Sequence, residues 1–372
     1  MIRVPYNLKA GPALILPPSA TTLPAAIAAT KAFLDPSTGT TAMITGAGVS
    51  VESGIPDYRG PTGTYTVNKD YRPIFYSEFI DRHTVRQRYW ARSFLGWEAV
   101  RLAKPNRVHR YIGELMKEGW LTSLVTQNVD SLHSAYVSDV TEIHGSLASV
   151  VCLTCNSMFS RIELQKQLAE LNPDWDDLLQ QELDRLARQE IESVIRDPIK
   201  DFRLNPDGDL ELPSSIRYDQ FKYPTCPSCA EKGLAHTEHD GKSWSLDNQN
   251  VSIPHSKRKC NDVGVLKPDV VFFGENVVPE ARAAAEQKMR DADKILVVAS
   301  SLATYSAFRL IKENKHAGKP IGVINMGPVR GEHELLGKGD LRVSFSAGDV
   351  LGGIWDSLRK TNYRRNHQQA HV

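Results

Sequence analysis

The 372-residue sequence predicts an α/β fold with two parts. The larger part is expected to be a doubly wound, Rossmann-like parallel sheet, and the smaller part a zinc ribbon combined with helices. Three observations predict this division. A tight turn, Gly46-Ala47-Gly48, follows a short apolar run. Several other β-rich apolar runs also end in polar groups, and two Cys-x-x-Cys pairs stand among helical patterns between these runs.

Composition excludes some classes of protein. Apolar residues make up 41% of the chain and charged residues 24%, which is ordinary for a globular protein. The net charge is only +1, so electrostatics do not favour nucleic acid or an anionic membrane as a direct partner. No apolar run approaches the roughly 20 residues that a membrane span requires. We therefore expect neither nucleic-acid binding nor a membrane span.

The two ends of the chain differ from the rest. The first 34 residues contain Arg3, Lys9 and Lys31 but no acidic residue. An acid-poor start of this kind is typical of a transit peptide, although five prolines interrupt any helix there. Residues 1–22 are therefore predicted to be either a transit segment or a flexible arm. The polar residues 361–372 are predicted to form a flexible tail.

The glycine turn is the first candidate for a ligand site. Small residues directly after a buried strand let backbone N–H groups approach a phosphate closely. The spacing departs from the Gly-x-Gly-x-x-Gly pattern because the third glycine is missing. Taken alone, Gly46 and Gly48 favour a purely structural turn over a ligand site.

Polar residues after other strands strengthen the case. In a parallel sheet, ligands bind at the carboxyl ends of the strands. The runs 121–133, 141–146 and 295–305 each place polar groups there, and 321–328 does so at the far end. The side chains expected to converge on one ligand are Gln127, Asn128, Asp130, His144, Ser300, Ser301 and Asn325.

Two cysteine pairs predict a metal site. Cys152 with Cys155 and Cys226 with Cys229 can supply four thiolates to one tetrahedral Zn²⁺. The gap of roughly 70 residues carries helical periodicity at 161–171 and 174–195. Disulfides and a redox pair are the alternatives, but the odd number of cysteines and the absence of a secretory segment disfavour disulfides.

The remaining cysteine and its histidine neighbours are not expected to bind this metal. Cys260 is interpreted as a free thiol in a basic, polar loop. His236, His239 and His255 are interpreted as residues of a solvated loop, although histidine is also a metal ligand.

Taken together, these motifs resemble the sirtuins, the NAD-dependent protein deacylases. The matching motifs appear in the family's order over roughly residues 40–355: GAGVSVESGIPDYR, TQNVD, HG, the two CxxC pairs, KPDVVFFGE, SSL and INMGP. RQRYWAR, LNP, NPDGD and LKPDVVFFGE are most similar to the class II, mitochondrial branch, in particular to its lipoamidase and ADP-ribosyltransferase-like member. The branch implies a location in the mitochondrial matrix, with cytoplasm or nucleus as the alternative.

The resemblance implies a reaction. A sirtuin consumes NAD: nicotinamide leaves, the acyl-lysine oxygen attacks the ribose, and O-acyl-ADP-ribose and free lysine are released. His144 matches the general base, a role that suits imidazole near neutral pH. Asn128 and Asp130 match the other catalytic residues, and acyl-lysine proteins are the implied partners.

The resemblance also implies the NAD contacts. Asn128 would position the ribose or a water, Gln127 would hold a ribose hydroxyl, and Asp130 with Asp57 would hold the nicotinamide carboxamide. Ala299 stands where the family usually has glycine, at a small loss of backbone freedom. The full expected set is Gly46, Ala47, Gly48, Ser50, Ile55, Pro56, Asp57, Tyr58, Arg59, Gln127, Asn128, Val129, Asp130, Ala299, Ser300, Ser301, Asn325, Met326, Gly327 and Ala347.

Substrate contacts are expected on two segments. Residues 267–275 are predicted to be a strand ending in a turn, whose edge would pair with the substrate backbone through Val271, Phe272, Phe273, Gly274 and Glu275. One of the two phenylalanines is expected to be a core residue, because strand neighbours face opposite ways.

The acyl group is expected to meet a helix over 86–92. Tyr89 and Arg92 share a helix face and would bind an acyl carboxylate together, with Arg86 and Arg88 adding positive charge. A solvated arginine face and a neutral, lipoyl-like acyl chain remain as alternatives.

Two other functions remain as rivals. NAD-dependent mono-ADP-ribosylation shares the cleavage of nicotinamide, and a non-catalytic zinc-ribbon module would need no base. A hydride-transfer dehydrogenase is disfavoured because the full glycine fingerprint is absent. The expected NAD-binding domain combines 23–60, 105–148 and 263–360. The helical part of the small domain is expected at 61–104 and the zinc module at 149–262. The oligomeric state is not predicted.

Overall fold

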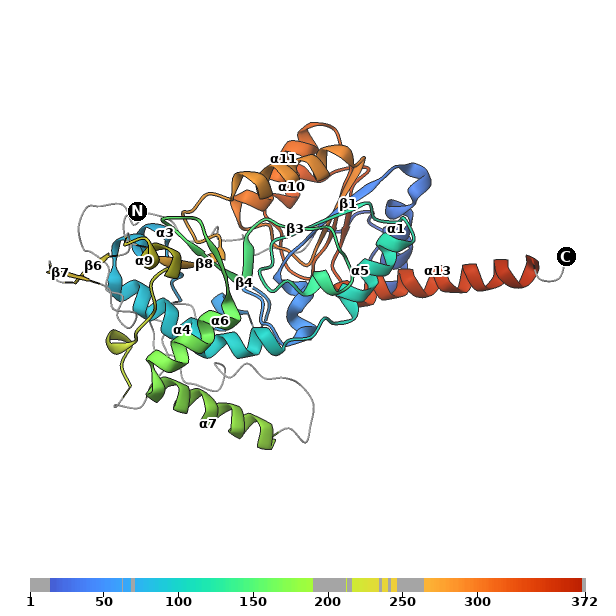
Figure 1. The fold of residues 1–372 in the computed structure, drawn as a ribbon. Helices are drawn as coiled ribbons and strands as arrows, with labels where there is room; N and C mark the ends of the chain where they lie inside the picture. The colour runs from blue at the N-terminus through green and yellow to red at the C-terminus, as the bar shows by residue number, and fades with distance from the viewer. Residues whose placement is uncertain are drawn as a thin grey trace.

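The computed structural model describes residues 14–61, 63–67, 71–189, 212, 216–233, 236–239, 242–245 and 264–369. These residues form a large α/β part and a smaller part that carries the cysteines (Figure 1). The predictions for residues 1–13, for 205–209 and for Cys260 and His255 concern residues outside the described part of the chain.

The large part is organised around a parallel sheet. Its strands, in the order β11-β10-β9-β1-β2-β3, are β11 (Leu341–Val343), β10 (Ile321–Ile324), β9 (Lys294–Val298), β1 (Thr41–Thr45), β2 (Ser123–Thr126) and β3 (Val140–Glu142). Numbered along the chain, this is the 3-2-1-4-5-6 order of doubly wound nucleotide-binding folds. The predicted fold class is confirmed.

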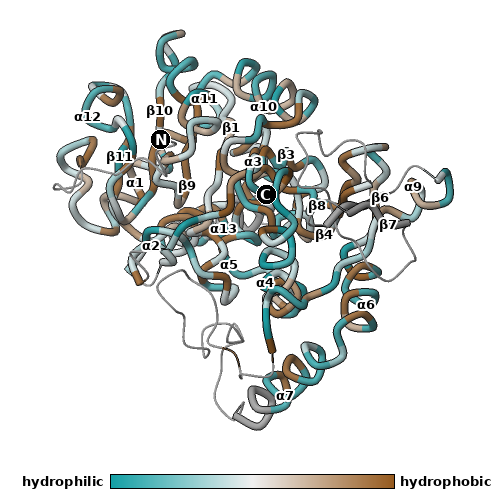
Figure 2. Tube along the Cα trace, turned by 90° about the vertical axis from the view of Figure 1, so that its left-hand side faces the viewer, coloured by the Kyte–Doolittle hydropathy of each residue, from teal (hydrophilic) through white to brown (hydrophobic). Residues whose placement is uncertain are grey.

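Helices cover both faces of this sheet, so its central strands are buried throughout. Met43 packs on one face with α1 (Leu23–Leu34), α5 (Arg107–Lys117) and α13 (Ala347–Gln369). Its neighbour Ile44 packs on the other face with α10 (Pro279–Asp291) and α11 (Tyr305–His316). Figure 2 shows hydrophobic residues along the central strands and hydrophilic ones mainly on outer helical turns.

The smaller part has its own sheet and core. β4 (Gly145–Cys152) lies between β5 (Met158–Ser160) and β8 (Leu266–Val270), all antiparallel. A separate hydrophobic cluster, including Phe79, Trp90 and Phe221, joins this sheet to the helices around it. The helices are α2 (Thr64–Val67), α3 (Tyr76–Asp81), α4 (His83–Leu102), α6 (Arg161–Leu171), α7 (Pro173–Gln189) and α9 (Pro227–Glu231); β6 (His236–His239) and β7 (Lys242–Ser245) form a hairpin.

Short elements complete the fold. They are the 3₁₀ turns η1 (Pro36–Thr38), η2 (Ala47–Ser53), η3 (Leu132–Ala135) and η4 (Tyr218–Gln220), and the helix α12 (Glu332–Leu335). The helical patterns predicted between the two cysteine pairs are confirmed at α6 and α7, as far as Gln189.

β8 differs in position from the expectation. It was assigned to the large domain, but it pairs with β4 in the small sheet. β4 spans the predicted boundary at 148/149, because it runs from Gly145 to Cys152 and pairs with β5 and β8 of the small sheet. The strand predicted over 267–275 ends at Val270, where Lys267 and the Phe272 N–H both bind Glu275 and close a turn.

Regular structure extends further toward both chain ends than the sequence patterns indicated. Leu16 exchanges two backbone hydrogen bonds with Arg342, and Ala20 is fully buried, so this stretch is part of the fold. The segment predicted as a flexible tail from 361 begins within α13, which continues to Gln369 and projects from the body (Figure 1). No glycine or proline interrupts the last sixteen or so residues of that helix.

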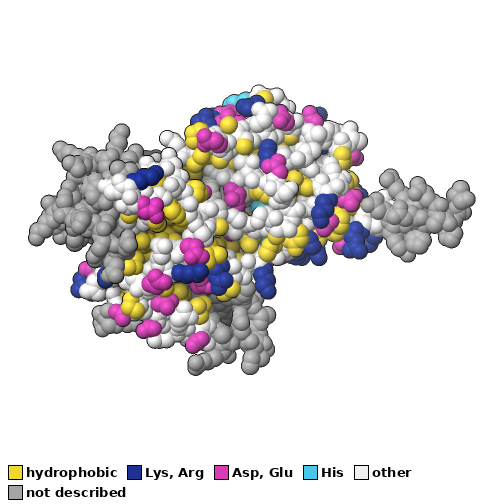
Figure 3. Space-filling view, in the orientation of Figure 1, with side chains coloured by type: hydrophobic (Ala, Val, Ile, Leu, Met, Phe, Trp, Pro, Cys, Tyr) yellow, Lys and Arg dark blue, Asp and Glu magenta, His cyan; other side chains and the backbone are white. Residues whose placement is uncertain are grey.

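The surface carries no dominant charge on the face drawn in Figure 3, where acidic and basic side chains are interspersed. This agrees with the net charge of +1. Within the described residues, no helix has the length and apolar character of a membrane span.

Candidate active site

A cleft of about 2630 Å³ opens at the carboxyl ends of β1, β2, β9 and β10. It lies beside β1 and β9, where the strand order reverses, and this switch point is where doubly wound folds bind ligands. Pockets for single small molecules measure roughly 300–1,000 Å³. The cleft is therefore large enough for a dinucleotide and a second substrate together.

The turns after β1 and β9 approach each other closely on the cleft floor. A Cβ added to Gly46 would lie 2.7 Å from the Ser300 Cβ, and one added to Gly48 would lie 2.9 Å from the Ala299 Cβ. Two backbone hydrogen bonds, from Gly46 to Val298 and from Gly48 to Ala299, connect the turns. Glycine is therefore required here by the distance between two backbones.

Ala299 has a left-handed backbone, with φ +51°. A residue with a Cβ destabilises the folded state by roughly 1–2 kcal/mol in this region, whereas glycine does not. The sequence-based expectation that this position would prefer glycine thus has a structural reason. The chain tolerates alanine because the surrounding turn is fixed by its bonds to Gly48 and Ile324.

Three polar residues form a compact group at one end of the cleft. The Ser50 hydroxyl donates to Asp130 over 2.6 Å, and the Asn128 amide donates to the Ser50 oxygen over 3.1 Å. Asp130 also accepts from the Leu132 N–H, which fixes its carboxylate. The predicted catalytic residues Asn128 and Asp130 therefore share one hydrogen-bonded network.

Gln127 is held from three sides. Its amide nitrogen donates to the Ser300 hydroxyl over 2.8 Å and to the Thr45 carbonyl over 3.2 Å. Its amide oxygen accepts from the Thr304 hydroxyl over 3.2 Å. The side chain thus joins the ends of β1, β2 and β9 at the centre of the cleft.

His144 lies between the two sheets, after β3 and before β4. Its Nδ1 is 3.0 Å from the Gln127 carbonyl oxygen, which can only accept, so Nδ1 carries the hydrogen. Nε2 then carries the lone pair of the ring and accepts from the Ser306 hydroxyl over 2.8 Å. Burial lowers the pKa of His144, partly offset by the Gln127 carbonyl, so the ring is a neutral base at pH 7.

Ser306 was missed in the sequence. It lies in the first turn of α11 and lines the cleft. Hydroxyl residues are common at helix starts, so the local pattern signals a helix start and nothing more. The contact with His144 spans 162 positions and only the fold reveals it.

The segment after η2 forms one wall. Ile55 and Pro56 line the cleft, and Asp57 accepts from the Gly60 N–H over 2.8 Å. The Arg59 guanidinium stacks over the Tyr65 ring at 5.1 Å. Arg59 therefore connects two parts of this loop through its contact with Tyr65.

The far wall depends on a fully buried arginine. Arg342 forms an ion pair of 2.7 Å with Glu332 and donates to the carbonyls of Asn325 and Gly327 over 2.7 and 2.8 Å. A buried charge is stable only when it is paired and hydrogen-bonded in this way. Arg342 thereby fixes the loop that carries Asn325, Met326 and Gly327.

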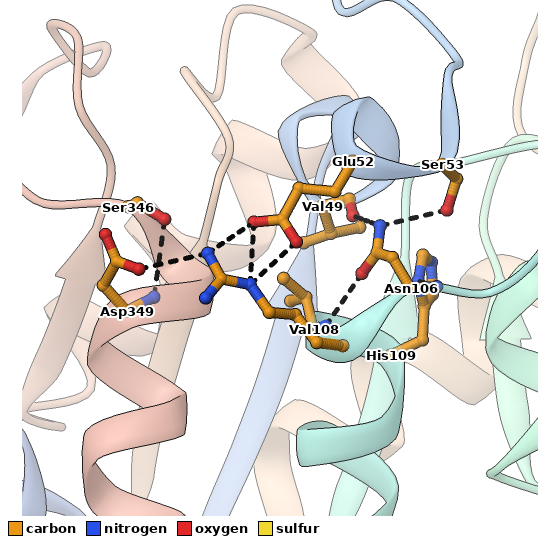
Figure 4. A network of polar contacts seen from close by, with 9 residues as sticks. Val49, Glu52, Ser53, Asn106, Val108, His109, Ser346 and Asp349 are labelled. Carbon is orange, nitrogen blue, oxygen red and sulfur yellow. Dashed lines mark hydrogen bonds and ion pairs between the residues drawn. The ribbon is translucent and has the colours of Figure 1, made fainter. Parts of the chain in front are cut away.

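An ion-pair network closes the outer edge (Figure 4). Arg107 contacts both oxygens of Glu52, the closest at 2.8 Å, and also Asp349 at 3.0 Å. Asn106, beside it, donates to the Val49 carbonyl over 2.7 Å. These contacts connect the starts of α5 and α13 to the glycine turn.

Tyr89 and Arg92 both line the cleft from α4. Tyr89 packs against Phe272, and Arg92 stacks over the Tyr71 ring at 5.5 Å. The expectation that Arg86 adds positive charge here is wrong. Arg86 is fully buried and donates to main-chain carbonyls of Phe79 and Ile80, because its position on α4 faces the small part's core.

The predicted substrate segment follows β8 and lines the cleft. Phe272 is 9% exposed and belongs to the core, whereas Phe273 is only partly buried, so the expectation of one core phenylalanine is confirmed. The Val271 N–H donates to the His144 carbonyl over 2.9 Å. The segment is thereby tied to the backbone of the base.

The four cysteines come together as predicted. Sγ of Cys152 is 3.7 Å from that of Cys229, and Sγ of Cys155 is 3.6 Å from that of Cys226. A tetrahedral Zn²⁺ with bonds of about 2.3 Å sets sulfur–sulfur distances of about 3.8 Å. The Thr154 N–H donates to the Cys152 sulfur, as expected for a thiolate. The group fits a structural Zn²⁺ with no open position.

Every residue assigned from the sequence to NAD, to the acyl group or to the substrate backbone lines this one cleft. The individual roles remain predictions. His109 and His133, which are outside the expected site, are both buried.

The fold and the site define a doubly wound α/β protein with a ligand cleft at its switch point and a tetracysteine module. Residues 46–306 match the Sir2 family. The chain is 39% identical over 328 residues to the NAD-dependent protein deacylase SIR4 of Batrachochytrium dendrobatidis, covering 86% of this chain and 90% of that protein. It is 31% identical over 316 residues to the NAD-dependent protein deacylase Sirt4 of Drosophila melanogaster, covering 84% and 82%.

Solved structures show the same fold. A Sir2–p53 peptide–NAD⁺ structure matches with a TM-score of 0.54 at 21% identity, covering 88% of this chain and 98% of that one. A structure described as a basis for the mechanism and regulation of Sir2 enzymes matches with a TM-score of 0.55 at 23% identity, covering 90% and 98%. The chain belongs to the Sir2, or sirtuin, family.

Replacing Ala299 by glycine should stabilise the protein. Glycine removes the left-handed penalty but loses more entropy on folding, so a net gain of about 0.5–1 kcal/mol in unfolding free energy is expected. Thermal unfolding measures it. Ala299→Val should do the opposite, because a branched side chain would crowd Gly48. If Ala299→Gly lowers the unfolding free energy, the left-handed backbone at Ala299 is not a source of strain.

Cys226→Ser should lose bound zinc and destabilise the small part, because a hydroxyl is a poorer zinc ligand than a thiolate. Metal analysis of the purified protein measures the loss. Cys260→Ser is the matched control and should retain zinc. Wild-type protein with well under one Zn²⁺ per chain would exclude the structural site.

Proposed function

We propose that this sirtuin is an NAD-dependent protein-lysine deacylase that transfers the acyl group to ADP-ribose and releases nicotinamide. The single observation that carries this proposal is the neutral His144, with its Nε2 lone pair facing the cleft that also contains Asn128 and Asp130. The names of relatives in fungus and fly, both NAD-dependent protein deacylases, support it.

Each wall of the cleft has a role in this proposal. The turn of Gly46 and Gly48 has no side chain at either glycine, so a pyrophosphate can approach its main chain closely. The loop fixed by Arg342 lies at the adenosine end, and Ile55 with Pro56 encloses the nicotinamide end. Bound NAD supplies the electrophilic ribose carbon, and the acyl-lysine supplies the attacking oxygen.

Proton transfer is the task of His144. Its Nε2 accepts the proton of a ribose hydroxyl, while the Gln127 carbonyl keeps the ring oriented through Nδ1. For that transfer the ribose hydroxyl must replace the Ser306 hydroxyl at Nε2. Asn128, held by Ser50, orients the ribose or a water.

An acidic acyl group is the proposed substrate, read by Tyr89 and Arg92 as a pair. Both side chains line the cleft from the same helix, which supports the assignment. We also propose the mitochondrial matrix as the location, on the similarity to Sirt4-named relatives.

The decisive experiment incubates the protein with NAD and a panel of acyl-lysine peptides and follows the products by mass spectrometry. Formation of O-acyl-ADP-ribose together with deacylated peptide supports the proposal. Nicotinamide release with ADP-ribose attached to a protein acceptor, and no deacylation, would favour mono-ADP-ribosylation. No NAD consumption on any peptide would favour a binding module.

His144→Ala should abolish deacylation while NAD binding stays within a few-fold. Loss of a general base typically lowers the rate about 10²–10⁴-fold. Steady-state kinetics and NAD titration measure the two effects. Activity within about threefold of the wild type would remove His144 from the mechanism.

The pH profile of the wild type provides an independent check. The pKa of His144 is lowered, and the active form is the neutral one, so activity should fall only as pH drops through a value below the ordinary 6.5. An acidic limb of kcat/KM above about pH 7 would contradict this base.

Arg92→Met should weaken activity on succinyl- or glutaryl-lysine about ten- to a hundredfold, with little effect on acetyl-lysine. Methionine keeps much of the side chain's bulk but removes the guanidinium that pairs with a carboxylate. Competing peptides assayed together measure the selectivity.

Tyr89→Phe is the matched variant for this pair. It removes one hydroxyl and keeps the packing on Phe272, so a smaller loss with the same selectivity is expected. Equal losses on acidic and neutral acyl groups from Arg92→Met would assign Arg92 a structural role and favour a neutral or lipoyl-like chain.

A further inference from the structure

Two buried histidines lie beneath the cleft and have no part in the proposed chemistry. His109 in α5 and His133 in η3 are 0% and 2% exposed, and their ring centres are 4.7 Å apart, edge to face. Burial lowers the pKa of both, that of His133 to about 3. Both rings are therefore neutral at pH 7, and each carries one hydrogen.

The hydrogen of His109 can be placed from its partner. The Asn106 backbone N–H donates to Nδ1 of His109 over 3.2 Å, and Figure 4 shows the two residues side by side. An atom that accepts has a lone pair, so the hydrogen is on Nε2. That Nε2 is buried and has no hydrogen-bond partner among the described residues.

The hydrogen of His133 follows from two threonines. The Thr45 hydroxyl donates to the Thr126 hydroxyl oxygen over 2.8 Å. Nε2 of His133 is 3.0 Å from the same Thr45 oxygen, whose only hydrogen is already used, so Nε2 is the donor. Nδ1 is then an acceptor, and it too is buried without a partner in the described part of the chain.

The two remaining nitrogens are complementary. His109 offers an N–H and His133 a lone pair, and one direct bond or one bridging water would satisfy both. If the threonine hydroxyls pointed the other way, both rings would present buried N–H groups to each other. An unpaired buried donor is costly, which favours the first arrangement.

Two hydrogen-bonded segments therefore lie end to end, Asn106 with His109 and His133 with Thr45 and Thr126. One hydrogen bond or one water between the two ring nitrogens would join them into a chain with a single direction. At its end the Asn128 backbone N–H donates to the Thr126 oxygen over 3.1 Å. At its start the Asn106 side chain donates to Val49 and Ser53 beside the glycine turn (Figure 4).

We propose that His109 and His133 are positioning residues for catalysis, which hold Asn128 through this chain. The assignment of a catalytic task to Asn128 rests on the proposed function. The two rings do not line the cleft, so they act only through Thr45 and Thr126. Without the His133 donor, the Thr45 hydroxyl is free to turn, and the acceptor of the Asn128 N–H is no longer fixed.

The first experiment needs no activity. Imidazole ¹⁵N NMR of the ligand-free wild type should show both rings with hydrogen on Nε2 and no titration between about pH 6 and pH 8. Hydrogen on Nδ1 of either ring, or a titration in that range, would overturn the chain. Failure of the deacylase assay would leave this result unaffected, so the two proposals fail separately.

The second experiment is kinetic. His133→Phe keeps the ring's size but removes both nitrogens, and it should lower kcat about tenfold while KM for NAD changes less than about threefold. His133→Gln retains an N–H near the position of Nε2 and should recover most of kcat. The exposed His316→Gln is the control and should match the wild type.

The outcomes distinguish a positioning role of His133 from a role in packing alone. Equal losses of kcat in His133→Phe and His133→Gln, or a rise in KM alone, would overturn the proposal. Combining His109→Phe with His133→Phe should lower kcat no further than the worse single variant, since both break one chain. If the phenylalanine variants do not fold, the His133→Gln variant decides, because loss of its activity would overturn the proposal.

Discussion

The close approach of two backbones, after β1 and after β9, is the constraint on which the cleft depends. Gly46 and Gly48 leave no room for a side chain against Ser300 and Ala299, so the two turns lie in direct contact. That contact fixes the floor of the cleft at the switch point of the sheet, where doubly wound folds bind ligands. The surrounding polar side chains are then arranged around a floor made of backbone.

Most of the polar groups in the cleft are fixed before any ligand binds. Gln127 is bonded at both ends of its amide, His144 at both ring nitrogens, and Arg342 on every side within the far wall. These groups are already ordered in the folded protein, so less conformational entropy is lost when a ligand binds. The loop of Asp57 and Arg59 is held mainly by local contacts.

Sequence patterns predicted the parts of the fold that depend on local chemistry. The buried strands, the cysteine knuckles and the polar strand ends follow from periodicity, residue type and spacing. The patterns could not predict contacts between distant positions, such as Ser306 with His144 or the burial of Arg86. The patterns also assigned β8 to the large sheet, because the sequence of an apolar strand does not show which strand it pairs with. They did not show that the helix over 347–369 continues past 361, because a polar, exposed helical turn and a flexible tail have similar compositions.

The position of His144 has a mechanical consequence. His144 lies between β3, the edge strand of the large sheet, and β4, the central strand of the small sheet, and its carbonyl accepts from Val271, which follows β8. A bend between the two parts would therefore carry the imidazole and residues 271–275 together. Because that bond joins main-chain atoms, it does not depend on the side chains of His144 and Val271. Substitutions in α4, which lines the cleft from a different element, would leave the bond in place.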